Sequence, residues 1–158
     1  MPMLQKQQLQ TIEQEARRFF EELGDIETVS IEQKEDEEEA TVSVLVKAAD
    51  PKILIGERGQ TLFEIQHLLK LIVRRKIAEP FYLSLDINDY KKNKEEYLRD
   101  LAQNAADEVV LLKKPKELPP MAAAERRIIH TALNQRGDVV SESAGEGLDR
   151  HVVISLKS

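Results

Sequence analysis

The tetrapeptide Gly56-Glu57-Arg58-Gly59 has residue types that could hold the backbone of a nucleic acid. Glycine has no Cβ, so a sugar-phosphate chain can approach the amides of such a loop, and the helix predicted to follow presents a positive N-terminus. Arg58 is the candidate phosphate contact, whereas Glu57 is an unusual neighbour for a phosphate. Two glycines three residues apart also occur in plain turns between helices, and the tetrapeptide alone leaves that alternative open.

A second candidate is the pair Arg126 and His130, four residues apart in a predicted helix. At this spacing both side chains project from the same face, about 5 to 6 Å apart at Cβ. Arginine can hold a phosphate with two parallel donors, and histidine can stack on a base or donate to a phosphate. Arg127 and Arg150 are candidate additional contacts. The alternative for Arg126 and His130 is an ordinary solvated helix face.

Two further basic groups could extend a track for the backbone, because each neutralised phosphate adds salt-dependent affinity. Few aromatic residues are available to stack on bases, so weak sequence selectivity is expected. A basic helix end also complements the helix dipole, which is an alternative explanation for the first group. The groups are Arg74, Arg75 and Lys76, and then Lys91, Lys92 and Lys94.

The sequence predicts a binding protein rather than an enzyme. It has no Cys, which excludes disulfides, thiolate metal sites and thiol nucleophiles. It has no Walker-type phosphate loop or serine elbow, and a ribonuclease using His130 as a base would need a second positioned group that the spacing does not supply. The five carboxylates at residues 35–39 are interpreted as a solvated hairpin tip rather than a metal site. No catalytic residue, metal site or cofactor is therefore predicted.

Hydrophobic periodicity predicts two successive blocks of helices and strands that position these residues. His67 and Tyr97 lie on or beside apolar helix stripes and are expected to pack there. The predicted elements are a helix at 4–23, a hairpin with strands around 29–31 and 40–46, a short helical turn at 53–55, a helix at 60–78, a strand at 81–87, helices at 90–112 and 121–134, and strands at 139–143 and 151–156.

The length of 158 residues suits one ordinary domain or two small ones, and the net charge is −6. Residues 1–50 carry 5 basic and 13 acidic side chains, whereas residues 87–158 carry 12 of each. The acidity is therefore concentrated in the N-terminal part, and it need not cancel a basic surface more than about 8 to 10 Å away. No apolar stretch approaches the roughly 20 residues of a membrane-spanning helix, and residues 1–10 lack a secretory signal. A cytoplasmic protein without membrane insertion is expected.

Nearly the whole chain resembles a known family. Residues from about 26 to 87, with the core VLVKAADPKILIGERGQTLFEIQHLLKLIVRRKI, resemble a type II KH domain, in which residues 56–59 take the place of the GxxG loop. Residues 88–158, especially PPMAAAERRIIHTALNQRGDVVSESAGEGLDRHVVI, resemble the single-stranded nucleic-acid-binding domain with an Arg-xxx-His motif. In this order the two resemble the Jag (SpoIIIJ-associated, KhpB) family of bacterial RNA-binding proteins.

The resemblance implies an α+β fold. After a helix at 1–25, a KH domain of α-β-β-α-α-β order would have a mixed three-stranded sheet with helices on one face. The second domain would have two helices packed on a β-sheet. Members of the family often carry an additional N-terminal Jag domain and a linker, and functions of that region are not carried over.

The resemblance also implies function. We expect single-stranded RNA as the ligand, with single-stranded DNA as a second one, bound by Gly56 to Gly59 and by the Arg-xxx-His region. The expected role is a post-transcriptional regulator or RNA chaperone linked to bacterial cell elongation, division and envelope control. The expected protein partner is a small KH-only protein or a second copy, bound through KH surfaces. The alternative is a scaffold that dimerises through its KH domain and binds RNA only incidentally.

Overall fold

The computed structural model describes residues 3–35 and 40–158. The chain divides into two compact units, Met1–Tyr90 and Lys91–Ser158. Residues 36–39, which hold four of the five carboxylates of the acidic run, lie outside the described residues, and with them the predicted hairpin tip. In the described part of the chain, no helix combines the length and apolar character needed to cross a membrane.

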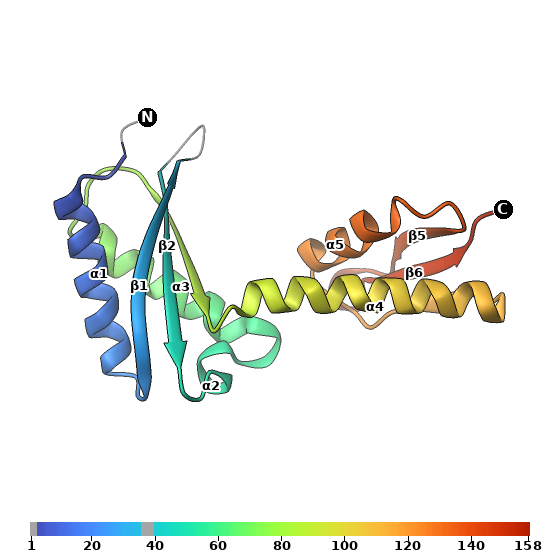
Figure 1. The fold of residues 1–158 in the computed structure, drawn as a ribbon, viewed down its shortest axis with the longest axis horizontal. Helices are drawn as coiled ribbons and strands as arrows, with labels where there is room; N and C mark the ends of the chain where they lie inside the picture. Colours follow the sequence, from blue (N-terminus) through green and yellow to red (C-terminus); the bar gives the residue numbers. More distant parts are fainter. Residues whose placement is uncertain (1–2, 36–39) are drawn as a thin grey trace. The chain divides into compact units, whose positions relative to one another are not determined.

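The first unit is built on a mixed three-stranded sheet (Figure 1). Strand β2 is central and pairs antiparallel with β1 and parallel with β3. The α-β-β-α-α-β order and the mixed sheet confirm the predicted fold class. The elements are α1 (Lys6–Glu21), β1 (Ile26–Glu35), β2 (Ala40–Ala48), α2 (Lys52–Ile55), a 3₁₀ turn (Glu57–Gly59), α3 (Gln60–Arg74) and β3 (Tyr82–Ile87).

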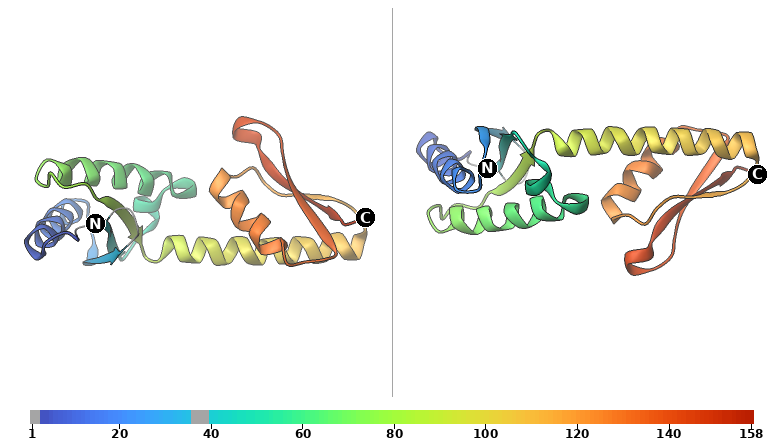
Figure 2. Two further views of the ribbon diagram at one scale, coloured as in Figure 1. Left: turned by 90° about the horizontal axis from the view of Figure 1, so that it is seen from above. Right: turned by 90° about the horizontal axis from the view of Figure 1, so that it is seen from below.

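One face of this sheet is buried because apolar residues alternate with polar ones along the strands. In β2, Val42, Val44 and Val46 are buried, whereas the residues between them are half-exposed. Helices α1 and α3 cover the buried face, and each contributes a fully buried side chain, Phe20 and Leu69. The two helices lie next to each other (Figure 2). The opposite face of the sheet carries no helix from the described residues of this unit.

The second unit is a three-stranded antiparallel sheet with two helices. Its core joins apolar residues of the long first helix, such as Ala102 and Val109, to Ile129 of the second helix and Ile154 of the central strand. The strand β4 is only two residues long, so no alternation in the sequence could reveal it. The elements are α4 (Tyr90–Leu112), β4 (Lys116–Glu117), α5 (Ala123–Leu133), β5 (Val139–Ala144), a 3₁₀ turn (Gly147–Asp149) and β6 (His151–Leu156).

Arg136, which follows α5, ties the start of β5 to α4. Its guanidinium donates to both carboxylate oxygens of Asp138, at 2.9 and 2.7 Å, and to Asp107 and Gln103 of α4, at 2.6 and 3.1 Å. The hydrogen bonds from Arg136 lower the pKa of Asp138 below its usual value. This cluster of polar contacts holds the α5–β5 connection against α4 and thereby positions α5 beside β5.

Helix α3 ends at Arg74, four residues before the predicted end. The amides of Lys76 and Ile77 both donate to the carbonyl of Val73, so the chain turns there. The turn brings Ile77 into the core, where it is buried. The prediction extended the helix toward Pro80 because nothing in the sequence before it marks an earlier stop.

Helix α5 begins at Ala123, two residues after the predicted start. The amide of Met121 donates to the carbonyl of Arg150 at 3.2 Å, which holds that residue beside the sheet rather than in the helix. The carboxylate of Glu125 accepts a hydrogen bond from the Ala122 amide and caps the first turn.

Two side chains that were expected to pack are exposed. His67 lies on the outer surface of α3. Tyr97 is 59% exposed, and the Nζ atom of Lys94 lies 5.9 Å from the centre of its ring. Both predictions are wrong because the buried stripes of these helices are narrower than the apolar patterns suggested.

Candidate nucleic-acid interface

The loop between α2 and α3 has a backbone that favours glycine at two positions. Gly56 has φ 71° and ψ −176°, and Gly59 has φ 79° and ψ 12°. A Cβ added to Gly56 would lie 2.1 Å from the Oγ1 of Thr61, and one added to Gly59 would lie 3.0 Å from the ring of Tyr90. The loop therefore requires both glycines for its own packing, whether or not a ligand approaches.

Glu57 and Arg58 form a single 3₁₀ turn between these glycines, and both side chains are exposed. Arg58 itself has φ 54° and ψ 23°, in the left-handed region that residues with a Cβ seldom occupy. Neither side chain has an ion-pair or hydrogen-bond partner among the described residues. The guanidinium of Arg58 is therefore available to a phosphate, and the role of all four loop residues in RNA binding stays a prediction.

The basic residues Arg74 and Arg75 lie at the far end of α3 from this loop. Fifteen residues of α-helix put them about 20 Å away. Lys76 forms an ion pair with Glu15 of α1, which ties two helices together. In the second unit, Lys94 pairs with a glutamate of α5 at 3.4 Å. The first group therefore fits the C-terminal end of a helix dipole better than a continuation of the loop.

In the second unit, Arg126 and His130 meet two serines that the sequence analysis did not single out. Ser141 and Ser143 are alternate residues of β5, so both side chains point to the same side of the strand. His130 Nδ1 lies 2.7 Å from Ser141 Oγ, and His130 Nε2 lies 2.9 Å from Ser143 Oγ. Arg126 Nη1 donates to Ser143 Oγ at 3.0 Å. The signal that could have found them is the spacing of two serines in the strand after the helix.

The direction of one hydrogen bond in this network is fixed, because a guanidinium can only donate. Ser143 accepts from Arg126 and can donate its own proton to Nε2 of His130. Nδ1 then carries the ring proton and donates to Ser141. In this tautomer both ring nitrogens of His130 and the Nη1 group of Arg126 have a partner.

The same surroundings keep His130 neutral at pH 7. Burial of the ring, and then the positive charge of Arg126, lower the pKa of His130 below its ordinary value. Both ring nitrogens are engaged, which leaves the faces of the ring for a base and the unused N–H groups of Arg126 for a phosphate. The geometry can therefore hold one nucleotide of a single strand.

Binding at this site is expected to depend on pH. Protonation adds a positive charge, so affinity for single-stranded RNA should rise, by about threefold to tenfold once the ring is protonated, as pH falls below about 6.5. The stability of the folded protein, in contrast, should decrease as pH falls. The unfolded state, with the ordinary and higher pKa for His130, binds more protons as pH falls below about 6.5, so the free energy of unfolding decreases there.

The measurement is RNA affinity across this pH range at constant ionic strength, with His130→Gln as the control. The glutamine variant should lose most of the pH dependence. An identical pH profile in wild type and His130→Gln would contradict the assignment.

Arg127 and Arg150 are not part of this hydrogen-bonded cluster. Arg150 donates to the carbonyl of Gly145 at 2.9 Å and so closes the turn between β5 and β6. Arg127 is exposed on α5 and has no ion-pair partner among the described residues. Contact of either side chain with RNA stays a prediction.

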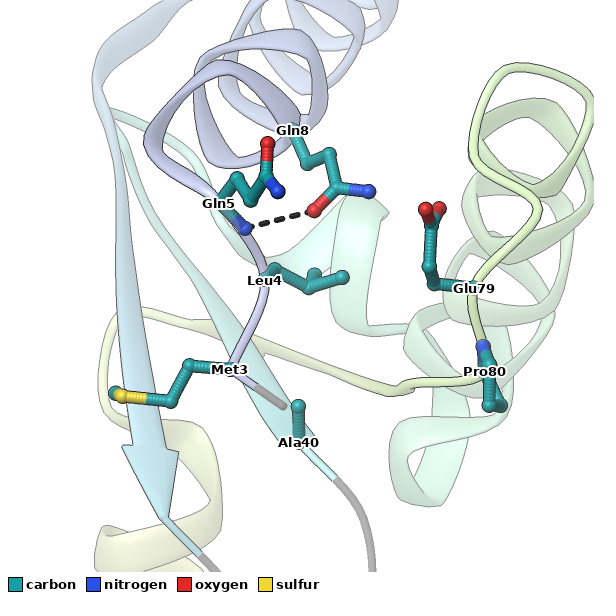
Figure 3. A pocket seen from close by; sticks show the side chains of 7 residues that line it. All are labelled: Met3, Leu4, Gln5, Gln8, Ala40, Glu79 and Pro80. Carbon is teal, nitrogen blue, oxygen red and sulfur yellow. Dashed lines mark hydrogen bonds between the residues drawn. The ribbon is translucent and has the colours of Figure 1, made fainter. Parts of the chain in front are cut away.

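A hollow of about 240 Å³ at the start of α1 does not have the chemistry of a nucleic-acid site (Figure 3). Gln5 and Gln8 lie at its rim, where the Gln5 amide donates to the Gln8 side chain at 2.7 Å. Its one charged lining residue among the described residues is the carboxylate of Glu79, which repels phosphate. Elsewhere in the described part of the chain, no three His, Asp or Glu side chains gather closely enough to hold a metal ion.

Comparisons with known proteins find a matching domain family and several relatives. The family of Arg-xxx-His (R-3-H) domains matches residues 96–156, which include both α5 and β5. The chain is 40% identical over 152 residues to the RNA-binding protein KhpB of Clostridium symbiosum, covering 94% of this chain and 68% of that protein. It is 32% identical over 146 residues to the RNA-binding protein KhpB of Bacillus subtilis (strain 168). This match covers 91% of this chain and 70% of that protein.

Proposed function

The chain belongs to the KhpB (Jag) family of RNA-binding proteins, and from this premise we propose that it binds single-stranded RNA through two surfaces. One is the Gly56–Gly59 loop of the first unit, and the other is formed by Arg126 and His130 in the second. The observation that carries the proposal is the hydrogen-bonded cluster of α5 and β5, which holds a guanidinium and a neutral imidazole side by side on a partly exposed surface.

The chemistry of this cluster favours a single strand over a duplex. An imidazole face can stack only on a base that is not already stacked within a helix. Arg126 supplies charge-assisted hydrogen bonds to a phosphate. Because the protein has a net charge of −6, long-range attraction is weak, and affinity should depend on these local contacts.

The cluster supports binding rather than cleavage. General acid-base cleavage requires a second titratable group beside the histidine. The described side chains within hydrogen-bond distance of the His130 nitrogens are the hydroxyls of Ser141 and Ser143. Neither hydroxyl titrates near neutral pH, so we propose a non-enzymatic role.

We further propose a cellular role from family membership. The protein would act in the cytoplasm as a post-transcriptional regulator or RNA chaperone, linked to bacterial cell elongation, division and envelope control. It would pair with a small KH-only protein or with itself through KH surfaces, and single-stranded DNA would be a second ligand. The proposed binding positions are residues 56–59 together with Arg126, Arg127, His130 and Arg150.

The proposal is tested by fluorescence anisotropy of labelled single-stranded RNA, single-stranded DNA and duplex RNA across a salt series. We expect single-stranded RNA to bind about 5- to 20-fold more tightly than the duplex. The log-log salt slope should be about −0.7 for each phosphate neutralised on a single strand. Equal binding of all three nucleic acids, or no binding, would contradict the proposal.

A specific observation favours a second candidate, a protein-interaction scaffold. Phe63, Leu68 and Leu71 on α3 are 64%, 51% and 51% exposed, which is unusual for large apolar side chains on one helix. This alternative is favoured if RNA binding is absent while light scattering shows concentration-dependent self-association.

A further inference from the structure

Helix α5 presents a second surface beside the Arg126 and His130 cluster. Successive residues of an α-helix are rotated by about 100°, so Arg126 and His130 lie on the flank that faces β5. Ala124, Ile128 and Thr131 lie on the flank toward α4. By the same rotation, the exposed side chain of Arg127 lies between the two flanks.

The flank toward α4 borders a groove of about 350 Å³, within the range of about 300 to 1,000 Å³ typical of small-ligand sites. Its two walls are α4 and α5, which belong to the same unit. The lining residues are Glu95, Arg99, Ala124, Arg127, Ile128 and Thr131.

The groove combines apolar and cationic side chains. Ile128 packs against the core and, with Ala124, supplies apolar contact surface. Arg99 is paired with Glu95 along α4, which restrains its guanidinium at one wall. Arg127 has no ion-pair partner among the described residues, so its positive charge is uncompensated in the groove. Apolar surface with guanidinium planes suits a nucleobase next to a phosphate.

We propose that this groove is a second nucleotide subsite, which takes a base from the RNA strand that Arg126 and His130 hold. The strand would cross α5 at Arg127, whose guanidinium would contact the phosphate between the two nucleotides. This inference rests on the proposed function. RNA is favoured over an acidic peptide because the groove and the cluster lie on adjoining flanks of one helix, with Arg127 of the groove lining between them.

The test uses the full chain and single-stranded oligouridines of two to eight nucleotides, with affinity measured by anisotropy. Wild type should gain affinity once the strand is long enough to cross α5. The double variant Arg99→Gln/Arg127→Gln should lose about fivefold for long strands and change little for the shortest strand bound. The control Arg18→Gln removes an exposed arginine of α1 and should behave like wild type.

A second readout locates the base. An oligonucleotide with one 4-thiouridine is cross-linked by light, and the modified peptides are mapped by mass spectrometry. We expect cross-links at groove residues such as Arg99, Ala124, Ile128 or Thr131, which disappear in Ala124→Trp, where the new side chain fills the groove. Circular dichroism of each variant checks that the fold is intact.

The possible outcomes distinguish failure of the groove subsite from failure of the proposed RNA binding itself. If wild type binds single-stranded RNA and Arg126→Ala/His130→Ala weakens it, but the groove variants behave like Arg18→Gln and no cross-link maps to the groove, the subsite is overturned and the function stands. If wild type binds no single-stranded RNA, both are overturned. Loss of affinity restricted to long strands, together with groove cross-links, supports the subsite.

Discussion

Replacing Arg126 and His130 together by alanine is expected to weaken the binding of single-stranded RNA by about 30- to 150-fold. A charge-assisted hydrogen bond to phosphate contributes about 1.5 to 3 kcal/mol, and stacking on a base contributes about 1 to 3 kcal/mol. The two side chains share Ser143, so their effects overlap, and about 2 to 3 kcal/mol is expected for the pair. Anisotropy at fixed salt measures the loss, and the salt slope should fall by about 0.7.

Two controls accompany this double variant. Arg18→Ala removes one exposed positive charge from α1 and should change affinity less than about twofold. Ser141→Ala/Ser143→Ala keeps Arg126 and His130 but removes their serine partners. A loss of affinity between that of Arg18→Ala and that of the double alanine variant would show that the serines position them. Wild-type affinity in Arg126→Ala/His130→Ala, with a native circular dichroism spectrum, would place the main RNA contact elsewhere.

Gly56→Ala is expected to reduce the free energy of unfolding of the first unit by about 3 kcal/mol. At φ 71° and ψ −176°, Gly56 occupies a region that is essentially restricted to glycine, at a cost of about 1 to 3 kcal/mol for other residues. The new Cβ would also lie 2.1 Å from Thr61 Oγ1, so α3 or the loop must shift. The first unit should melt roughly 10 to 20 °C lower, as measured by calorimetry.

Gly24→Ala is the matched control for this prediction. Gly24 also has a positive φ, 130°, but no atom lies within 4 Å of the position of its added Cβ. Gly24→Ala should therefore carry only the cost of the strained backbone, about 1 to 2 kcal/mol, without the steric contribution. Thr61→Ala in the Gly56→Ala background should recover part of the loss. Equal destabilisation by Gly24→Ala and Gly56→Ala would show that the contact with Thr61 is not responsible.

The strained backbone and close contact at Gly56 determine how the loop can be tested for RNA binding. A change at either loop glycine alters the fold of the loop before it alters a ligand contact. Arg58→Gln is a better probe, because the side chain is exposed and has no partner among the described residues. A loss of RNA affinity in Arg58→Gln with unchanged thermal stability would assign the loop to binding.

Local patterns in the sequence were enough to predict the long helices and strands and their order, but not the two-residue strand β4. The apolar repeat of α4 predicted its bounds, Tyr90–Leu112, because a helix that packs on one side has an apolar residue on that side every three or four positions. The alternation in β2 and β3 likewise predicted two strands with one buried face. The Arg126 and His130 spacing predicted that both side chains share one face of a helix.

Tertiary structure alone decided which groups these side chains meet. Ser141 and Ser143 reach His130 only because β5 folds back beside α5; their spacing places both on one side of a strand but does not determine which residues they meet. The same holds for Arg150, whose guanidinium closes a turn, and for the clash that makes Gly56 necessary. Periodicity reports which side of an element is buried, whereas hydrogen-bond partners and close contacts depend on how separate segments are brought together in space.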